Sequence, residues 1–164
     1  MRRFINHRKY FTSERRRGAA VVEFAIMAPV FLTLTLGSVE IGYALNASNT
    51  LYGVLREGGR LASQDWSNVL APGETANEKV TQDIRNMLTA ARIPGSEVTI
   101  NIVHAEGANA GAPFDLQDED NYLEMFTIEA TVPYDEISLI PGNYLGGQDL
   151  RATISFRMGR SNLD

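Results

Sequence analysis

The chain has 164 residues, a formal net charge of −5, two histidines and no cysteine. Disulfides and thiol chemistry are therefore excluded, and no His/Cys metal site, Cys-His pair or Ser-His-Asp triad can be assembled from these residues. Residues 1–17 carry seven basic residues and one acid, a net charge of +6, which leaves −11 for residues 18–164. Because the acidic body would repel phosphate, we expect no nucleic-acid partner, and we find no candidate cofactor site.

An apolar segment with a single charged side chain covers residues 18–36. Its nineteen residues are close to the roughly 20 that a helix needs to cross a bilayer, and Glu23 is its one charged residue. A carboxylate in such a helix costs on the order of 2.5–3.5 kcal/mol, so it usually has a partner or a role. We interpret Glu23 as a recognition group. The positive-inside rule predicts a cytoplasmic basic leader over residues 1–18 and an extracytoplasmic acidic body.

The junction of basic leader and apolar segment resembles a class III signal, the leader of type IV pilins. In that family a prepilin peptidase cuts after a glycine, which here is the bond between Gly18 and Ala19. The family's glutamate, here Glu23, then pairs with the new α-amino group of a neighbouring subunit. Such a pair fixes register, because either charge left alone is heavily penalised. An ordinary secretory signal peptide, cleaved near residues 44–48, is the alternative.

Further motifs narrow the resemblance to the TadE-like family of tight adherence pilus proteins, over about residues 18–60. In chain order they are Glu23-Phe24, Pro29, Gly37, Glu40-Ile41-Gly42 and Arg56-Glu57-Gly58-Gly59-Arg60. The chain departs from the pattern at Ala19, where many type IV pilins have phenylalanine, and at Gly59, where the family usually has alanine. We expect the second departure only to weaken the local helix.

The resemblance implies a non-enzymatic minor pilin or pseudopilin of a Flp-type IVb pilus, which serves surface attachment and biofilm formation. The implied partners are the prepilin peptidase, other pilus subunits, the inner-membrane assembly platform and the membrane itself. Glu23 and Phe24 would dock on a neighbouring subunit, and a second contact is implied at Arg56, Glu57, Gly58 and Arg60. A single-pass, envelope-anchored binding protein with an acidic head is the alternative function.

We expect the first helix to cover residues 19–66, with its transmembrane part at about residues 19–45. The predicted packing stripe consists of Ile41, Leu45, Ser48, Tyr52, Leu55, Gly59, Ala62 and Trp66, spaced by three or four. We expect the stripe to pack on the chain's own head; the alternative is that part of it also meets neighbouring subunits. Gly53, Gly58 and Gly59 each cost about 1 kcal/mol in a helix, which indicates close approach, a bend or an end. Pro29 should kink or locally melt the helix.

Residues 67–164 predict one small extracytoplasmic α+β domain. Thr75 and Glu78 have the spacing of a capping box at the start of a second helix that stops at Pro94. Residues 98–102, 126–132 and 150–158 alternate between apolar and polar, as antiparallel strands with one buried face do. The predicted fold is therefore a long N-terminal transmembrane helix, one further helix and a three-stranded antiparallel sheet, similar to pilins.

An acidic loop is the remaining candidate for chemistry. It contains Asp115, Asp118, Glu119, Asp120 and Glu124. Calcium prefers clustered oxygens, but the spacing does not fit an EF-hand, so we favour a solvated loop over a calcium site. Without a partner base, acid–base catalysis is not expected. We expect His104, at the end of the first strand pattern, to be a surface or edge residue.

Overall fold

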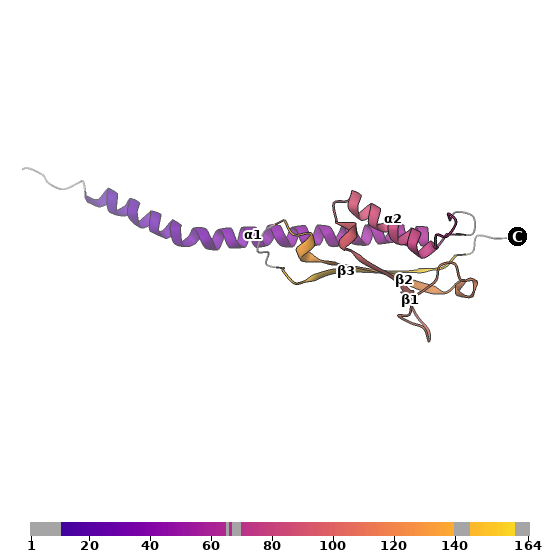
Figure 1. Ribbon diagram of the computed structural model, residues 1–164. Coiled ribbons are helices and arrows are strands. Elements are labelled where there is room, and N and C mark those ends of the chain that lie inside the picture. The colour runs from indigo at the N-terminus through magenta and orange to yellow at the C-terminus, as the bar shows by residue number, and fades with distance from the viewer. Residues whose placement is uncertain (1–10, 65, 67–69, 140–144, 160–164) are drawn as a thin grey trace, which may run out of the picture. The chain divides into compact units, whose positions relative to one another are not determined.

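The computed structural model describes residues 11–64, 66, 70–139 and 145–159, with the side chains of residues 11–17 outside the description. The chain divides into two compact units, Met1–Val39 and Glu40–Asp164. Helix α1, Phe11–Ala62, passes through both units (Figure 1). It ends four residues earlier than the expected position 66.

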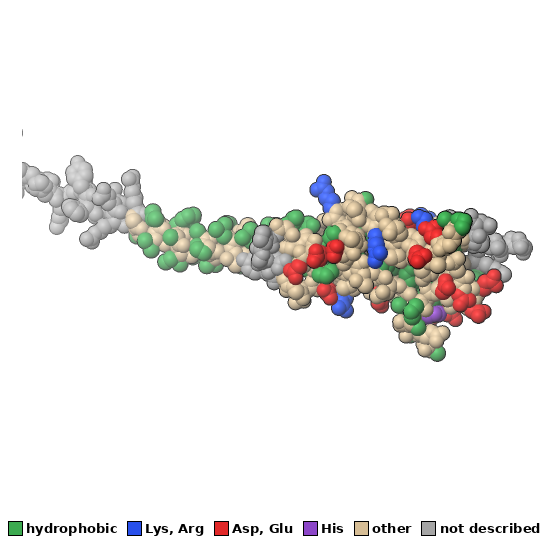
Figure 2. Space-filling view, viewed as in Figure 1, with side chains coloured by type: hydrophobic (Ala, Val, Ile, Leu, Met, Phe, Trp, Pro, Cys, Tyr) green, Lys and Arg blue, Asp and Glu red, His purple; other side chains and the backbone are tan. Residues whose placement is uncertain are grey.

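The apolar part of α1 lies in the first unit. From Val21 to Val39, the large hydrophobic side chains are between 43% and 72% exposed, and Figure 2 shows hydrophobic side chains along the visible side of this stretch of helix. The helix continues unbroken through Pro29, so local melting at the proline is not observed. The hydroxyl of Thr33 donates to the Pro29 carbonyl at 2.9 Å, and that of Thr35 donates to the Phe31 carbonyl at 2.8 Å. These polar groups are therefore satisfied within the helix.

In the second unit, α1 packs through a face that differs from the predicted stripe. Its buried members are Glu40, Ala44, Ala47, Leu51, Leu55, Gly58, Gly59 and Ala62. The predicted stripe is correct at Leu55, Gly59, Ala62 and Trp66. It is wrong at Ile41, Leu45 and Tyr52, which are 55%, 61% and 46% exposed. Between Glu40 and Leu51, the buried members of this face are the small residues Ala44 and Ala47.

Two adjacent glycines allow α1 to approach the rest of the head closely. A Cβ atom on Gly58 would lie 2.4 Å from Cγ1 of Ile84, and one on Gly59 would lie 1.9 Å from Cε2 of Phe156. Gly53, by contrast, faces open space. Close approach therefore explains Gly58 and Gly59, and the expected helix end also follows, at Ala62. The expectation that Gly59 only weakens the helix is wrong, because a larger residue there would collide with the sheet.

Helix α2, Ala76–Ala90, begins as predicted. The Glu78 N–H donates to the Thr75 hydroxyl at 3.2 Å, and the Glu78 carboxylate accepts from the Thr75 N–H at 3.2 Å, which completes the capping box. Val80, Ile84 and Leu88 form the buried face of the helix.

Three strands form an antiparallel meander within the described residues. They are β1, Thr99–His104; β2, Met125–Pro133; and β3, Asp149–Arg157. Strand β2 lies in the centre, which leaves β1 and β3 as the two edges. The core lies between the apolar face of the sheet and the two helices, where Phe126, Ile128 and Val132 are fully buried. The predicted α+β fold is confirmed.

Candidate assembly surface on the first helix

The predicted cleavage and docking residues lie on a fully exposed part of α1. Gly18 and Ala19 are helical and exposed, and no atom lies within 4 Å of the position of a Cβ on Gly18. Ala19 and Glu23 are four residues apart and share one face of the helix. Both Glu23 and Phe24 are exposed, with Phe24 at 72%. This stretch can therefore meet another molecule along its whole length.

A second carboxylate of α1 is placed quite differently. Glu40 is only 2% exposed, and its backbone carbonyl accepts a hydrogen bond of 3.3 Å from the Tyr134 hydroxyl. Burial, together with the charge of Glu40, raises the pKa of Tyr134, against a hydrogen bond with Ser138 that lowers it. Glu40 thus belongs to the head. The sequence placed it in a family motif but gave no sign of this tertiary contact.

Beside the buried face, α1 presents an exposed apolar ridge, defined as Ile41, Leu45 and Tyr52. Their spacing of four and seven residues places them along one side of the helix. All three are at least 46% exposed. This ridge is therefore the part of the predicted stripe that a neighbouring subunit could contact.

The basic cluster near the end of α1 divides between two faces. Gly58 is buried against Ile84, so it is a packing residue, whereas Arg56 and Arg60 are exposed. Arg60 donates from Nε to the Glu57 carboxylate at 3.0 Å. This hydrogen bond and the paired charge lower the pKa of Glu57 and raise that of Arg60. An exposed pair of this kind contributes little to stability.

Within the described residues, the two arginines are not paired with the acidic loop. Among the described residues, no ion pair joins Arg56 or Arg60 to the segment from Asp118 to Asp120. Asp118 instead accepts a 3.0 Å hydrogen bond from the Asp120 N–H, as Asx-turns do. Figure 2 shows acidic side chains on several parts of the visible head surface.

His104 and Glu124 form a side-chain contact that the sequence did not reveal. His104 Nδ1 lies 3.2 Å from Glu124 Oε2, and the imidazole packs edge-on against Phe114 with 4.7 Å between ring centroids. His104 is 9% exposed and ends the edge strand β1, so the expectation of a surface or edge residue is confirmed for the edge position. Within the described part of the chain, no three His, Asp or Glu side chains are grouped as metal ligands.

A comparison with known families decides what this helix resembles. Residues 18–60 match the family model described as TadE-like protein. The resemblance inferred from the motifs is thereby confirmed, and the match lies wholly within α1. It implies involvement in a tight adherence pilus and a structural rather than enzymatic role. Neither the comparison with curated proteins nor that with solved structures found a match.

The match also agrees with a membrane anchor. Within the described residues, the stretch Gly18–Ala62 contains a window of mean hydropathy 2.0 and is long and apolar enough to cross a membrane. The matched segment begins at Gly18, the predicted cleavage site, and ends at Arg60 in the basic cluster. It therefore includes Gly58 and Gly59, where α1 packs closely on the head.

Proposed function

We propose that the protein is a TadE-like minor pilin or pseudopilin that takes part in assembling a tight adherence pilus of the Flp-type IVb class. One observation carries the proposal. Glu23 is exposed on an apolar helix, on the same face as Ala19, where cleavage after Gly18 would create an ammonium group. An exposed carboxylate among lipid-facing side chains favours a partner supplied by another subunit.

The proposed location is the inner membrane, with the N-terminus cytoplasmic and the head outside. The α1 segment from residue 19 to residue 39 rises about 31 Å, which matches a hydrocarbon core of about 30 Å. The head begins to bury the helix at Glu40. We therefore place the end of the lipid-embedded part near Val39, inside the anchor of about residues 19–45 that the sequence suggests.

In this proposal, docking uses two parts of α1. The Glu23 carboxylate receives the terminal ammonium of a neighbour, and Phe24 packs on that neighbour's helix. Outside the membrane, the exposed ridge of Ile41, Leu45 and Tyr52 continues the contact. The Arg56 and Arg60 side chains add a charged contact to a further subunit or to the assembly platform.

Mass spectrometry of the mature N-terminus in a host with its prepilin peptidase tests the proposal. A chain that begins at Ala19 supports it, and Gly18→Leu should then leave a full-length precursor, because the peptidase subsite before the cut accepts no side chain. Gly37→Leu is the matched control, since Gly37 lies on the same helix with open space around it. An uncut wild-type chain would indicate a plain anchor, and a cut after residue 44 would indicate export of a soluble protein. Either result rejects the proposal.

A further inference from the structure

Strand β1 forms one edge of the sheet, and the chain's own loop pairs with only half of that edge. The Phe114 N–H donates to the Ile102 carbonyl at 2.9 Å, and the His104 N–H donates to the Ala112 carbonyl at 2.9 Å. A β-bridge between Val103 and Pro113 completes this short antiparallel pairing. The outer edge of β1 therefore accepts an extended segment at residues 102–104.

The other half of the edge, at residues 99–101, remains open. Strand hydrogen bonds alternate in direction, so the N–H and carbonyl of Ile100 point the same way as those of Ile102, outward from the sheet. No backbone group of the described residues pairs with them on that side. Unpaired edge groups of this kind are a template for a further strand.

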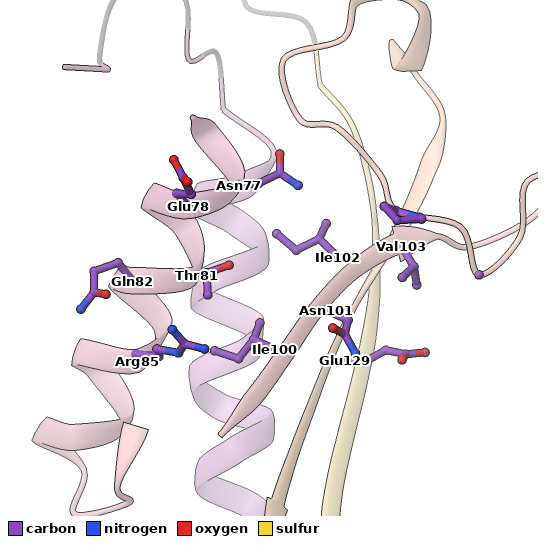
Figure 3. A pocket seen from close by; sticks show the side chains of 12 residues that line it. Asn77, Glu78, Thr81, Gln82, Arg85, Ile100, Asn101, Ile102, Val103 and Glu129 are labelled. Carbon is purple, nitrogen blue, oxygen red and sulfur yellow. The ribbon is translucent and has the colours of Figure 1, made fainter. Parts of the chain in front are cut away.

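A groove of about 640 Å³ lies along this open edge, between α2 and β1 (Figure 3). Its volume is within the range of about 300–1,000 Å³ that is typical of ligand pockets. Arg85 of α2 points toward Ile100, and its Nε atom is buried with no hydrogen-bond acceptor among the described residues. Glu129 lies beside Asn101, opposite α2 in the close-up view.

We propose that this groove binds an extended peptide segment of a partner protein, which adds a strand to β1 and places a carboxylate side chain against Arg85. The backbone of the segment would bond to Ile100, and so continue the antiparallel line that residues 112–114 begin. Every second side chain of an added strand faces α2. An acidic residue at such a position supplies the acceptor that Nε of Arg85 lacks among the described residues.

This inference is independent of the pilus assignment, because the groove residues lie outside the segment that matches the family. The occupant is defined by its chemistry. A helix would leave the Ile100 backbone groups unpaired, and a basic side chain facing Arg85 would leave its Nε atom without an acceptor.

The test uses the full chain in detergent micelles and three synthetic seven-residue peptides rich in valine and threonine. The first has a central glutamate, the second has lysine at that place, and the third is the glutamate peptide with alternate backbone nitrogens methylated. Fluorescence anisotropy measures the dissociation constants, and hydrogen exchange measures protection of the Ile100 amide. Arg85→Gln is the groove variant, and Arg151→Gln, on β3 and outside the groove, is its matched control.

The glutamate peptide should bind about threefold or more tightly than the lysine peptide, as partly exposed charge pairs allow. Methylation should weaken its binding about tenfold, because the strand hydrogen bonds are lost. Binding should slow exchange at Ile100, and Arg85→Gln but not Arg151→Gln should remove the preference for glutamate. The proposal is overturned if the glutamate peptide does not bind, if the methylated peptide binds equally well, or if the preference survives Arg85→Gln.

Discussion

Alanine substitutions at two glycines of α1 should change stability in opposite directions. Alanine is about 1 kcal/mol more favourable than glycine in a helix interior. At Gly53, where a Cβ enters open space, this gain should appear almost in full. At Gly59 the same Cβ would lie 1.9 Å from the Phe156 ring, so the ring or the helix must move.

The cost at Gly59 can be estimated from what the ring contacts. Overpacking a core typically costs about 1–3 kcal/mol. Phe156 also stacks on Phe126, with 6.1 Å between ring centroids, and a displaced ring loses part of an interaction of about 0.5–1.5 kcal/mol. After the helix-propensity gain is subtracted, Gly59→Ala should destabilise the head by about 1–2 kcal/mol. The two variants should therefore differ by about 2–3 kcal/mol.

Urea titration of the full chain in micelles, followed by tryptophan fluorescence, measures this difference. Trp66 is the only tryptophan in the chain and is 7% exposed, so its emission reports unfolding of the head. Phe156→Leu removes the ring, and Gly59→Ala in that background should lose most of its cost, a coupling that a double-mutant cycle detects. If Gly59→Ala stabilises the head as much as Gly53→Ala does, the close approach of α1 to β3 is refuted.

Three further variants test the docking residues and the hydrogen bond between Tyr134 and Glu40. Glu23→Val should keep its membrane level but lose co-purification with other pilus subunits, because a neighbour's ammonium is left unpaired; wild-type co-purification would remove the carboxylate from assembly. A double Arg56→Gln, Arg60→Gln variant should lose complex formation but keep its thermal midpoint, since solvent screens exposed pairs and they contribute little to stability; a lowered midpoint would instead assign them to the fold. Tyr134→Phe should cost about 1 kcal/mol through the lost hydrogen bond to Glu40. The raised pKa of Tyr134 means that the unfolded chain ionises first, so wild-type stability should fall above about pH 10, and this fall should be weaker in Tyr134→Phe.

Local signals in the sequence predicted the elements that depend on local interactions. The Thr75 capping box placed the start of α2, and alternation placed all three strands. The boundaries were less accurate, as β1 extends to His104 rather than residue 102. This extension depends on pairing with β2 and with residues 112–114, which no local pattern specifies.

The buried face of α1 was misplaced for a physical reason. The predicted stripe favoured large apolar residues such as Ile41 and Leu45, yet close packing of a helix on a sheet uses small ones, here Ala44 and Ala47. Both faces of this stretch are apolar or small, so periodicity alone did not distinguish them. The sequence placed Glu57 and Arg60 in one cluster because they are three positions apart in the chain. It did not indicate the contact of Glu40 with Tyr134, which are 94 positions apart.

The proposed pairing of subunits also constrains how neighbouring helices are offset. If two parallel helices place the Ala19 ammonium of one beside Glu23 of the other, they are shifted by four residues, or about 6 Å along the axis. The same shift brings Ile41 of one subunit level with Leu45 of the other, both of which are exposed. One displacement therefore satisfies the charge pair in the membrane and the apolar ridge outside it. The spacing of four residues between members of each pair is the feature of α1 that makes the two contacts compatible.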